Sequence, residues 1–356
     1  MNLASYTALC VVLAALNGGA QSARSQTPWS SSESQCVEFK DTLVTSATNI
    51  AGITLNSTGS GTARIRPTAF QMFFRFCEPH HSTRRARTVQ ILGHGATYNH
   101  RYWNIDYRPE IYSYERAALA EGYSVMSYDL LGSGNSAKPD PFNIVQNPLN
   151  IEIAVKVIRA VRHGALSFSH TQLPRFDNVV YVGHAMGSMI LNGVLAASPG
   201  LVDAAVLTGY AHVKLPTPTV ASEALPERFG RLSNGYTVIP HREVFYGPAG
   251  SYEDELLQLD MATQDVVSVG EAVTLSSGAI SAPEFTGHVL AVNGEQDVVY
   301  CVESGCPNLF REIAFYPAAA SFEAHVVSNT GHVLNLHETS RSTYAMILDW
   351  LDRKGF

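Results

Sequence analysis

One stretch of the sequence has the spacing of a nucleophile elbow, in which a strand turns sharply into a helix and presents a reactive side chain at the turn. It reads Gly183-His184-Ala185-Met186-Gly187, between an apolar run and a helical run that begins at Met189. Small residues two places either side of the centre let the backbone fold back without a Cβ clash. The central position, which holds serine in that motif, is Ala185. The stretch therefore has the architecture for attack on a carbonyl carbon without the attacking oxygen.

A base and a carboxylate that could orient it follow later in the chain. His332 comes directly after a predicted strand, and Gly331 permits the tight turn that would present its ring. Asp297 closes the run Gly294-Glu295-Gln296-Asp297 behind another predicted strand. A base of this kind needs a carboxylate to fix its imidazole tautomer. We favour this pair over His337, expected to face solvent or neighbouring structure, and over Glu295, expected to lie inside its turn and point elsewhere.

Backbone N–H groups at two places could stabilise an oxyanion. The loop His94-Gly95-Ala96-Thr97 follows an apolar strand, and Met186 would open a helix immediately after the elbow. The N–H groups of Ala96 and Met186 would together complete an oxyanion hole. Tyr98 is a candidate for an additional hydroxyl donor.

The order of the predicted elements explains how these residues could meet. Helical patterns cover 109–120, 151–161, 189–197 and 344–351, and they alternate with buried strands at 88–92, 123–128, 178–182, 202–208, 288–292 and 322–328. Two antiparallel strands, at 37–54 and 71–76, precede them. This order predicts an α/β fold with a mostly parallel sheet of about eight strands and helices on both faces. The elbow, Asp297 and His332 would then share the edge formed by the carboxyl ends of the strands.

One long segment interrupts the alternation, from residue 211 to about residue 285. It contains Pro216, Pro218, Pro226, Pro240 and Pro248, together with an acidic helical run at 252–261. Its position after the strand that follows the elbow predicts a cap over the carboxyl edge of the sheet, where ligands bind in such folds. The alternative is a surface excursion unrelated to the site.

The composition and one misleading motif limit the possible partners. Gly132-Ser133-Gly134 begins like a dinucleotide loop, but a third glycine is missing and Pro139 and Pro141 follow, so no nucleotide cofactor is predicted. No other cofactor and no metal site is predicted. A formal net charge of −7 argues against a nucleic-acid partner.

Residues 1–23 have the layout of a secretory signal peptide, with an apolar run from Ala8 to Leu16 followed by small residues. A short N-terminal anchor is the alternative, but this run is too short to cross a hydrocarbon core of about 30 Å. We therefore expect a secreted protein without stable membrane insertion. A polar lead-in at 24–35 would precede a single domain at 36–356.

Four cysteines remain after the signal peptide, an even number that fits an oxidising compartment. Cys301 and Cys306 are close enough to close a small loop, which would leave Cys36 to pair with Cys77. The two other pairings and four free thiols are the alternatives. Asn56 begins the sequon Asn-Ser-Thr and should mark an exposed, glycosylated turn.

Taken together, the motifs resemble those of the α/β-hydrolase superfamily, specifically its secreted lipase and esterase-like branch with an inserted cap. The resemblance covers about residues 70–352. It rests on the elbow, the His94-Gly95 loop, the loop from Tyr128 to Ser136, Gly294-x-x-Asp297 and Gly331-His332. It implies that Ala185 occupies the nucleophile position, with Asp297 as acid and His332 as base. It also implies that Ala96 and Met186 form the oxyanion hole.

The alanine at position 185 has two explanations. Either serine was replaced in a serine esterase, or a natural chain works without the nucleophile; the chain carries a leader and no tag, which favours the second. An intact His332–Asp297 pair could still act as a general base on water or on an acidic C–H group. The apolar character of the cap suggests a small apolar carbonyl substrate, and an ester, lactone, thioester or carbon acid would suit the site. The resemblance includes enzymes of biosynthetic pathways. The alternative function is that of an inactive, secreted ligand-binding pseudo-hydrolase.

Overall fold

The computed structural model describes residues 35–356 apart from 81–82, 169–170, 214, 216–224 and 304. The predicted signal peptide and all but the last residue of the predicted lead-in lie outside these ranges.

An eight-stranded sheet runs through the molecule in the order β1-β4-β6-β5-β9-β10-β13-β14. β1 is antiparallel to β4, β4 is antiparallel to β6, and the other neighbours are parallel. The strands are β1 (Gln35–Ile50), β4 (Thr62–Glu78), β5 (Thr88–Gly93), β6 (Ser124–Tyr128), β9 (Asn178–His184), β10 (Ala204–Thr208), β13 (His288–Gly294) and β14 (Ser321–Val327). The predicted fold class, a mostly parallel sheet of about eight strands, is confirmed.

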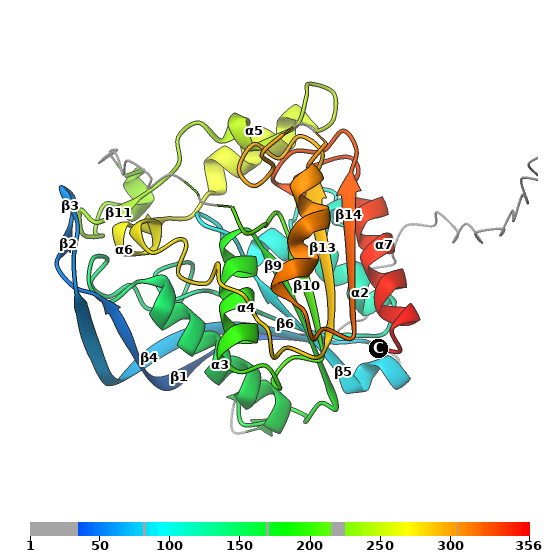
Figure 1. The fold of residues 1–356 in the computed structure, drawn as a ribbon, viewed down its shortest axis with the longest axis horizontal. Helices are drawn as coiled ribbons and strands as arrows, with labels where there is room; N and C mark the ends of the chain where they lie inside the picture. Colours follow the sequence, from blue (N-terminus) through cyan, green and yellow to red (C-terminus); the bar gives the residue numbers. More distant parts are fainter. Residues whose placement is uncertain (1–34, 81–82, 169–170, 214, 216–224, 304) are drawn as a thin grey trace, which may run out of the picture.

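Helices cover both faces of the sheet (Figure 1). α3 (Asn147–His163) and α4 (Met186–Ala197) pack on one face, and α2 (Tyr114–Ala120) and α7 (Ser340–Arg353) pack on the other. In β9, Val179 and Tyr181 join the first core, whereas Val180 and Val182 join the second. A strand with alternate side chains buried on both faces reads as a continuous apolar run, which is why its position was predictable.

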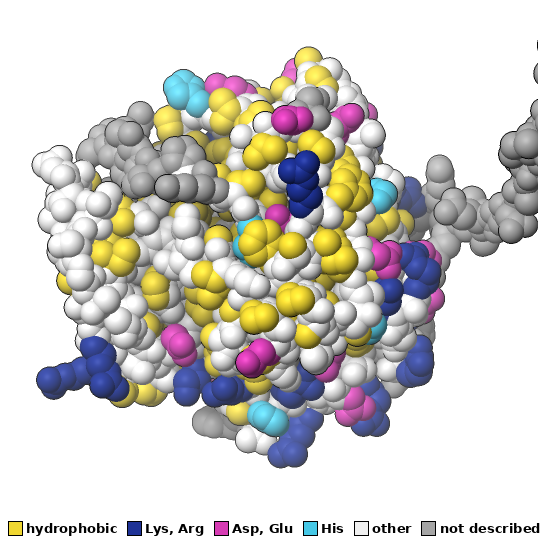
Figure 2. Space-filling view, viewed as in Figure 1, with side chains coloured by type: hydrophobic (Ala, Val, Ile, Leu, Met, Phe, Trp, Pro, Cys, Tyr) yellow, Lys and Arg dark blue, Asp and Glu magenta, His cyan; other side chains and the backbone are white. Residues whose placement is uncertain are grey.

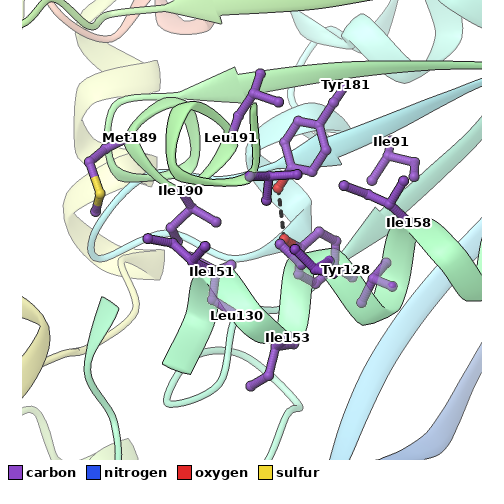
Figure 3. Packing of buried hydrophobic residues seen from close by; sticks show 14 of the residues in the cluster. Ile91, Tyr128, Leu130, Ile151, Ile153, Ile158, Tyr181, Met189, Ile190 and Leu191 are labelled. Atoms are coloured by element: carbon purple, nitrogen blue, oxygen red, sulfur yellow. Dashed lines mark hydrogen bonds between the residues drawn. The ribbon is translucent and has the colours of Figure 1, made fainter. Parts of the chain in front are cut away.

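The core beneath α3 and α4 contains one polar pair among aliphatic side chains. The hydroxyls of Tyr128 and Tyr181 share a hydrogen bond of 2.7 Å, surrounded by buried isoleucine and leucine side chains (Figure 3). The pair links β6 to β9, and each hydroxyl satisfies the other, so burial of these two polar groups is tolerated.

The predicted helix over 109–120 is wrong as a single element. It is divided into α1 (Pro109–Tyr112) and α2 by Ser113, which has an extended backbone (φ −106°, ψ 107°). The Ser113 hydroxyl accepts a hydrogen bond of 3.1 Å from the N–H of Arg116, so it caps α2. A serine side chain that caps a helix competes with continuation of the preceding helix, and here α1 ends at the capping residue.

β1 and β4 form a long antiparallel hairpin at one edge of the sheet (Figure 1). Its tip consists of β2 (Ile53–Thr54) and β3 (Ser57–Thr58), and Asn56 is exposed between them, as expected of an exposed turn. A disulfide joins Cys36 of β1 to Cys77 of β4. The second disulfide joins Cys301 to Cys306 in the loop after β13. Both predicted disulfides are therefore present.

The segment at 211–285, here called the insert, separates β10 from β13. Its elements are η3 (Glu227–Phe229), β11 (Tyr236–Thr237), η4 (Arg242–Phe245), α5 (Asp254–Thr263), β12 (Val267–Ser268) and α6 (Val269–Val273). α5 lies beyond the arrowhead of β14, at the top of Figure 1. Shorter elements elsewhere are η1 (Arg84–Arg87), η2 (His100–Trp103), β7 (Ser167–Phe168), β8 (Thr171–Gln172), η5 (Pro307–Phe315) and η6 (Leu334–Leu336).

One face of the molecule carries a group of exposed apolar side chains. Four of them lie between β13 and the end of η5, at Val298, Val302, Phe310 and Ile313. Figure 2 shows hydrophobic side chains gathered on this face, over η5. Among the helices that the structure describes, none has the length and apolar character needed to cross a membrane.

Candidate active site

The turn from β9 to α4 has the backbone of a nucleophile elbow. Ala185 sits at φ 49° and ψ −112°, a conformation that costs a residue with a side chain roughly 1–3 kcal/mol. The flanking glycines are needed because the chain passes itself closely. A Cβ at Gly183 would lie 2.6 Å from the Cα of Ser188, and one at Gly187 would lie 2.2 Å from the carbonyl oxygen of Gly93. The strained turn is therefore complete although its central side chain is a methyl group.

His332 and Asp297 are joined as the sequence predicted. The imidazole Nδ1 lies 3.0 Å from Asp297 Oδ2, and both side chains are buried. The other carboxylate oxygen accepts hydrogen bonds from the N–H groups of Val299 (2.8 Å) and Tyr300 (3.1 Å). Burial alone would raise the pKa of Asp297, but His332 and these two N–H groups outweigh it and hold the pKa below its ordinary value. The ionised carboxylate accepts a hydrogen bond from Nδ1–H, which fixes the tautomer with a lone pair on Nε2 of His332.

The competing histidine has a structural place. His337 is buried, and its Nε2 accepts hydrogen bonds from the N–H groups of Gly247 (2.9 Å) and Gly331 (3.0 Å). Its Nδ1 lies 2.9 Å from the carbonyl oxygen of Val333, to which it donates. His337 therefore contacts neighbouring structure and does not face solvent. The residue ties the His332 loop to the insert, and burial lowers its pKa to about 4.

The competing carboxylate also has another partner. Glu295 Oε2 accepts a hydrogen bond of 3.0 Å from the N–H of Asn329. This contact holds together two neighbouring loops at the edge of the sheet. Asp297 is the carboxylate bonded to His332.

The predicted oxyanion loop lies against the elbow. A Cβ added to Gly95 would come within 3.3 Å of the Cβ of Ala185. His94 fixes this loop, because its Nδ1 lies 2.8 Å from the Gly95 carbonyl oxygen and its Nε2 accepts from the N–H of Leu130 at 3.0 Å. Ala96 and Met186 both line the cavity that also contains Ala185 and His332. The Tyr98 ring lines the same cavity, but its hydroxyl donates to Asp260 at 3.1 Å.

The cavity at the elbow has a volume of about 130 Å³ and a mainly apolar wall. The insert contributes Ile239, Phe245 and Leu275, and the loop after β13 contributes Val299. A single water needs about 10–15 Å³ measured in this way, so the space admits a small organic group. The insert therefore forms part of the wall of the cavity.

A buried ion pair that was not predicted connects the insert to the loop that contains Thr97 and Tyr98. Arg242 of η4 has no exposed surface, and its Nη2 lies 2.8 Å from Asp260 Oδ1 in α5. Its Nη1 donates to Thr97 Oγ1 at 2.7 Å, and its guanidinium lies 4.5 Å from the centre of the Tyr98 ring. Asp260 also accepts hydrogen bonds from Tyr98 and Tyr246. These partners lie far apart in the chain, so no local spacing could have revealed them.

One group of possible metal ligands lies close together in the described part of the chain. It consists of Cys36, Cys77 and Glu115. The two sulfurs are joined in a disulfide, and Glu115 is paired with Arg75 at 3.0 Å. Each of these three groups therefore already has a partner.

Fold and site together define a protein with a serine-hydrolase-type fold. The chain belongs to the α/β-hydrolase family, with residues 90–342 matching that family. No protein of curated function matches the sequence.

Several solved structures share the fold at low identity. A monoacylglycerol lipase of Paleococcus ferrophilus is 12% identical with a TM-score of 0.55, and the match covers 80% of this chain and 99% of that one. A soluble variant of monoglyceride lipase from Saccharomyces cerevisiae is 12% identical with a TM-score of 0.56, covering 80% and 92%. A meta-cleavage product hydrolase from Pseudomonas fluorescens, solved as a serine-to-alanine mutant, is 15% identical with a TM-score of 0.53, covering 80% and 95%. At these identities the likeness concerns the fold.

Proposed function

We propose that the protein hydrolyses an apolar carbonyl compound, an ester, lactone or thioester, by general-base catalysis without a covalent intermediate. His332 acts as the base, and Asp297 fixes its tautomer and stabilises the imidazolium that forms. The N–H groups of Ala96 and Met186 stabilise the oxyanion. The observation that carries the proposal is the 3.0 Å contact between His332 and Asp297 in the wall of an apolar cavity.

The burial of this pair supports an enzyme over a scaffold that only binds. An ionised carboxylate with almost no exposed surface is expensive to bury unless it is paired. The Asp297 carboxylate accepts hydrogen bonds from three donors, the N–H groups of Val299 and Tyr300 and the imidazole of His332. The ring of His332 lines the cavity. A binding protein would gain nothing from this arrangement, whereas a base on water requires it.

A hydrolysis assay with p-nitrophenyl acetate tests the proposal on the protein and two variants. His332→Ala should lower the turnover rate by about 10²–10⁴-fold, because proton transfer from water loses its acceptor. Asp297→Asn should lower it similarly through the wrong tautomer, whereas Glu295→Gln, in the same turn but bonded to Asn329, is the matched control and should leave it unchanged. Turnover that survives His332→Ala would exclude His332 as the base.

Substitution of the nucleophile position separates this proposal from an engineered serine esterase. Ala185→Ser should produce a burst of p-nitrophenol with an ester substrate, because the turn already presents its side chain beside His332. The rate of the burst should fall when His332→Ala is added. If the unsubstituted protein has no turnover and only Ala185→Ser is active, the chain is an inactivated esterase.

The methyl group at position 185 favours one other function, a ligand-binding pseudo-hydrolase. Such a protein would bind p-nitrophenyl acetate in the apolar cavity without turnover, and Ala185→Ser would show no burst. That result would also remove the catalytic roles of His332 and Asp297.

We further propose that the protein is secreted and glycosylated at Asn56. The support is an exposed sequon at the hairpin tip together with two disulfides, which form in oxidising compartments. Expression in a eukaryotic secretory system should yield a glycosidase-sensitive mass increase that Asn56→Gln abolishes. A mass that glycosidase leaves unchanged would contradict the modification.

A further inference from the structure

The elbow carries a second imidazole that the mechanism above does not use. His184 is the last residue of β9, directly before Ala185, and it lines the same cavity as His332. It has no exposed surface. Its ring stacks on Tyr102, with centroids 4.5 Å apart and an interplanar angle of 14°, and its centroid lies 5.0 Å from that of His332. Two histidine rings therefore stand next to each other at the position where the nucleophile is absent.

The hydrogen bonds around His184 define its tautomer. The Thr208 hydroxyl donates to the carbonyl oxygen of Gly183 at 2.8 Å, so its oxygen has only lone pairs left to offer. His184 Nδ1 lies 3.2 Å from that oxygen and must therefore carry the proton. The lone pair is on Nε2, which is buried and has no hydrogen-bond partner in the described residues. An unpaired buried acceptor beside a catalytic base calls for a ligand.

The two imidazoles converge on one point of the backbone. Gly209 has φ 57°, and a Cβ built on it would lie 2.8 Å from Cε1 and 3.0 Å from Nδ1 of His184, and 3.2 Å from Cε1 of His332. The Cε1 atoms of the two rings therefore both lie beside this glycine, and in each ring Nε2 is bonded to Cε1. The absence of a side chain at position 209 leaves room for the two rings.

We propose that His184 and His332 jointly hold the attacking water, each accepting one of its two hydrogens at Nε2. The inference rests on the proposed function and adds a second residue to it. A serine hydroxyl has one hydrogen and needs one acceptor, whereas a water has two and is oriented by two acceptors. Burial lowers the pKa of His184 well below its ordinary value, and His332 and His94 lower it further, so its lone pair persists while His332 takes the proton.

The atoms balance as follows for an ester. The water oxygen forms a bond to the carbonyl carbon, one water proton moves to His332 Nε2, and the negative charge collects on the carbonyl oxygen in the oxyanion hole. The bond to the alkoxy oxygen then breaks, and the departing oxygen takes the proton from His332. The second water hydrogen stays on the new carboxylic acid, bonded to His184 Nε2, until it is lost to solvent. The products are one acid and one alcohol.

The test compares His184 variants in two backgrounds, the protein with Ala185 and the Ala185→Ser variant, using p-nitrophenyl acetate. His184→Phe keeps a ring to stack on Tyr102 but removes both nitrogens. With Ala185 it should lower the turnover rate at least about 10-fold, because water loses one of its two acceptors. In the Ala185→Ser background the burst rate should change less than about twofold, since serine needs only His332.

Two further variants keep the test decisive. His184→Gln offers an amide oxygen as acceptor and should recover part of the rate lost in His184→Phe. Glu295→Gln, whose side chain bonds to Asn329 and does not line the cavity, is the control and should leave the rate unchanged. If His184→Phe yields no burst because it fails to fold, His184→Gln is compared in the two backgrounds instead. Equal losses in both backgrounds would show a structural role and overturn the inference.

The variants of His184 and His332 distinguish failure of this inference from failure of the proposed function. If His332→Ala lowers turnover and neither His184 variant does, the general-base function stands and the second imidazole is not part of it. If His332→Ala leaves turnover intact, the proposed function fails, whatever His184 does.

Discussion

The edge of the sheet and the insert are built in different ways, although both form walls of one cavity. Residues at the edge follow strands such as β9, in which Val179, Val180, Tyr181 and Val182 are completely buried among apolar neighbours. The insert buries polar and charged side chains among its apolar ones. The polar and charged ones include Arg242, Ser251, Asp260, Gln264, Asp265, Ser268, Glu271 and Thr274. The first region is held by apolar area and strand pairing, whereas the second depends on specific polar contacts as well as apolar burial.

This difference determines what each region can do. Apolar burial is non-directional and does not depend on any single contact. The buried strands can therefore hold a strained turn such as that at Ala185. Buried polar contacts depend on each partner, and the loss of one partner leaves the other desolvated. We therefore expect the insert to have a well-defined position but to open locally more easily than the sheet. Such local opening would let a substrate reach the cavity.

Hydrogen exchange should show the largest difference between the two regions. Amides of β9 should exchange only when the whole domain unfolds, at a free energy of about 5–15 kcal/mol. Amides of α5 should exchange through local opening, at least about 100-fold faster. Mass spectrometry of peptides covering 179–182 and 254–263 provides the measurement. Equal protection in the two peptides would contradict the contrast drawn above.

Removal of the buried cation should destabilise the insert strongly. Arg242→Met leaves Asp260 buried without its ion partner, which typically costs about 3–5 kcal/mol. Arg231→Met, at an exposed position of the same insert, is the matched control and should change the unfolding free energy by less than about 0.5 kcal/mol. Urea denaturation measures both. Adding Asp260→Asn to Arg242→Met should recover part of the loss, and similar effects of the two single arginine variants would refute this role of the pair.

Stability should respond to pH in opposite directions at the two regions. Burial raises the pKa of Glu271, in the insert, to about 7. Its contribution is present below its unfolded pKa near 4.5 and is lost as the pH rises through 7, a change of about 3 kcal/mol. His337, at the sheet edge, has its pKa lowered to about 4. Its contribution is present above an unfolded pKa near 6.5 and is lost as the pH falls through 4.

Glu271→Gln separates the two contributions. The variant keeps the shape of the side chain but does not titrate, so the His337 contribution should remain and the unfolding free energy should rise with pH between 4.5 and 6.5. Glu284→Gln, at an exposed position of the insert, is the control and should follow the unsubstituted protein. Identical pH curves for Glu271→Gln and the unsubstituted protein would mean that Glu271 does not contribute in this range.

The same difference explains what the sequence could predict. The strands and the pair Asp297–His332 were accessible, because buried parallel strands are apolar runs and the site residues directly follow them. The contacts of the insert were not accessible. Arg242 meets Thr97 across a separation of 145 residues, and no periodicity connects them. His184 was recognised only as part of the elbow, since its tautomer depends on Thr208 in the neighbouring strand.

The smallest expected effect concerns the strain at the elbow. Ala185→Gly should relieve backbone strain of about 1–3 kcal/mol, against losses of about 0.5–1 kcal/mol in chain entropy and about 0.8 kcal/mol for the buried methyl group. The expected result is a small net stabilisation of about 0.5–1 kcal/mol. Ala204→Gly, in the extended strand β10, has the same losses and no strain to relieve, so it should destabilise by about 1–2 kcal/mol. Thermal unfolding should therefore show changes in stability of opposite sign for the two variants. If both glycines destabilise equally, the turn stores no strain, and the sheet edge does not hold the nucleophile position in its reactive conformation.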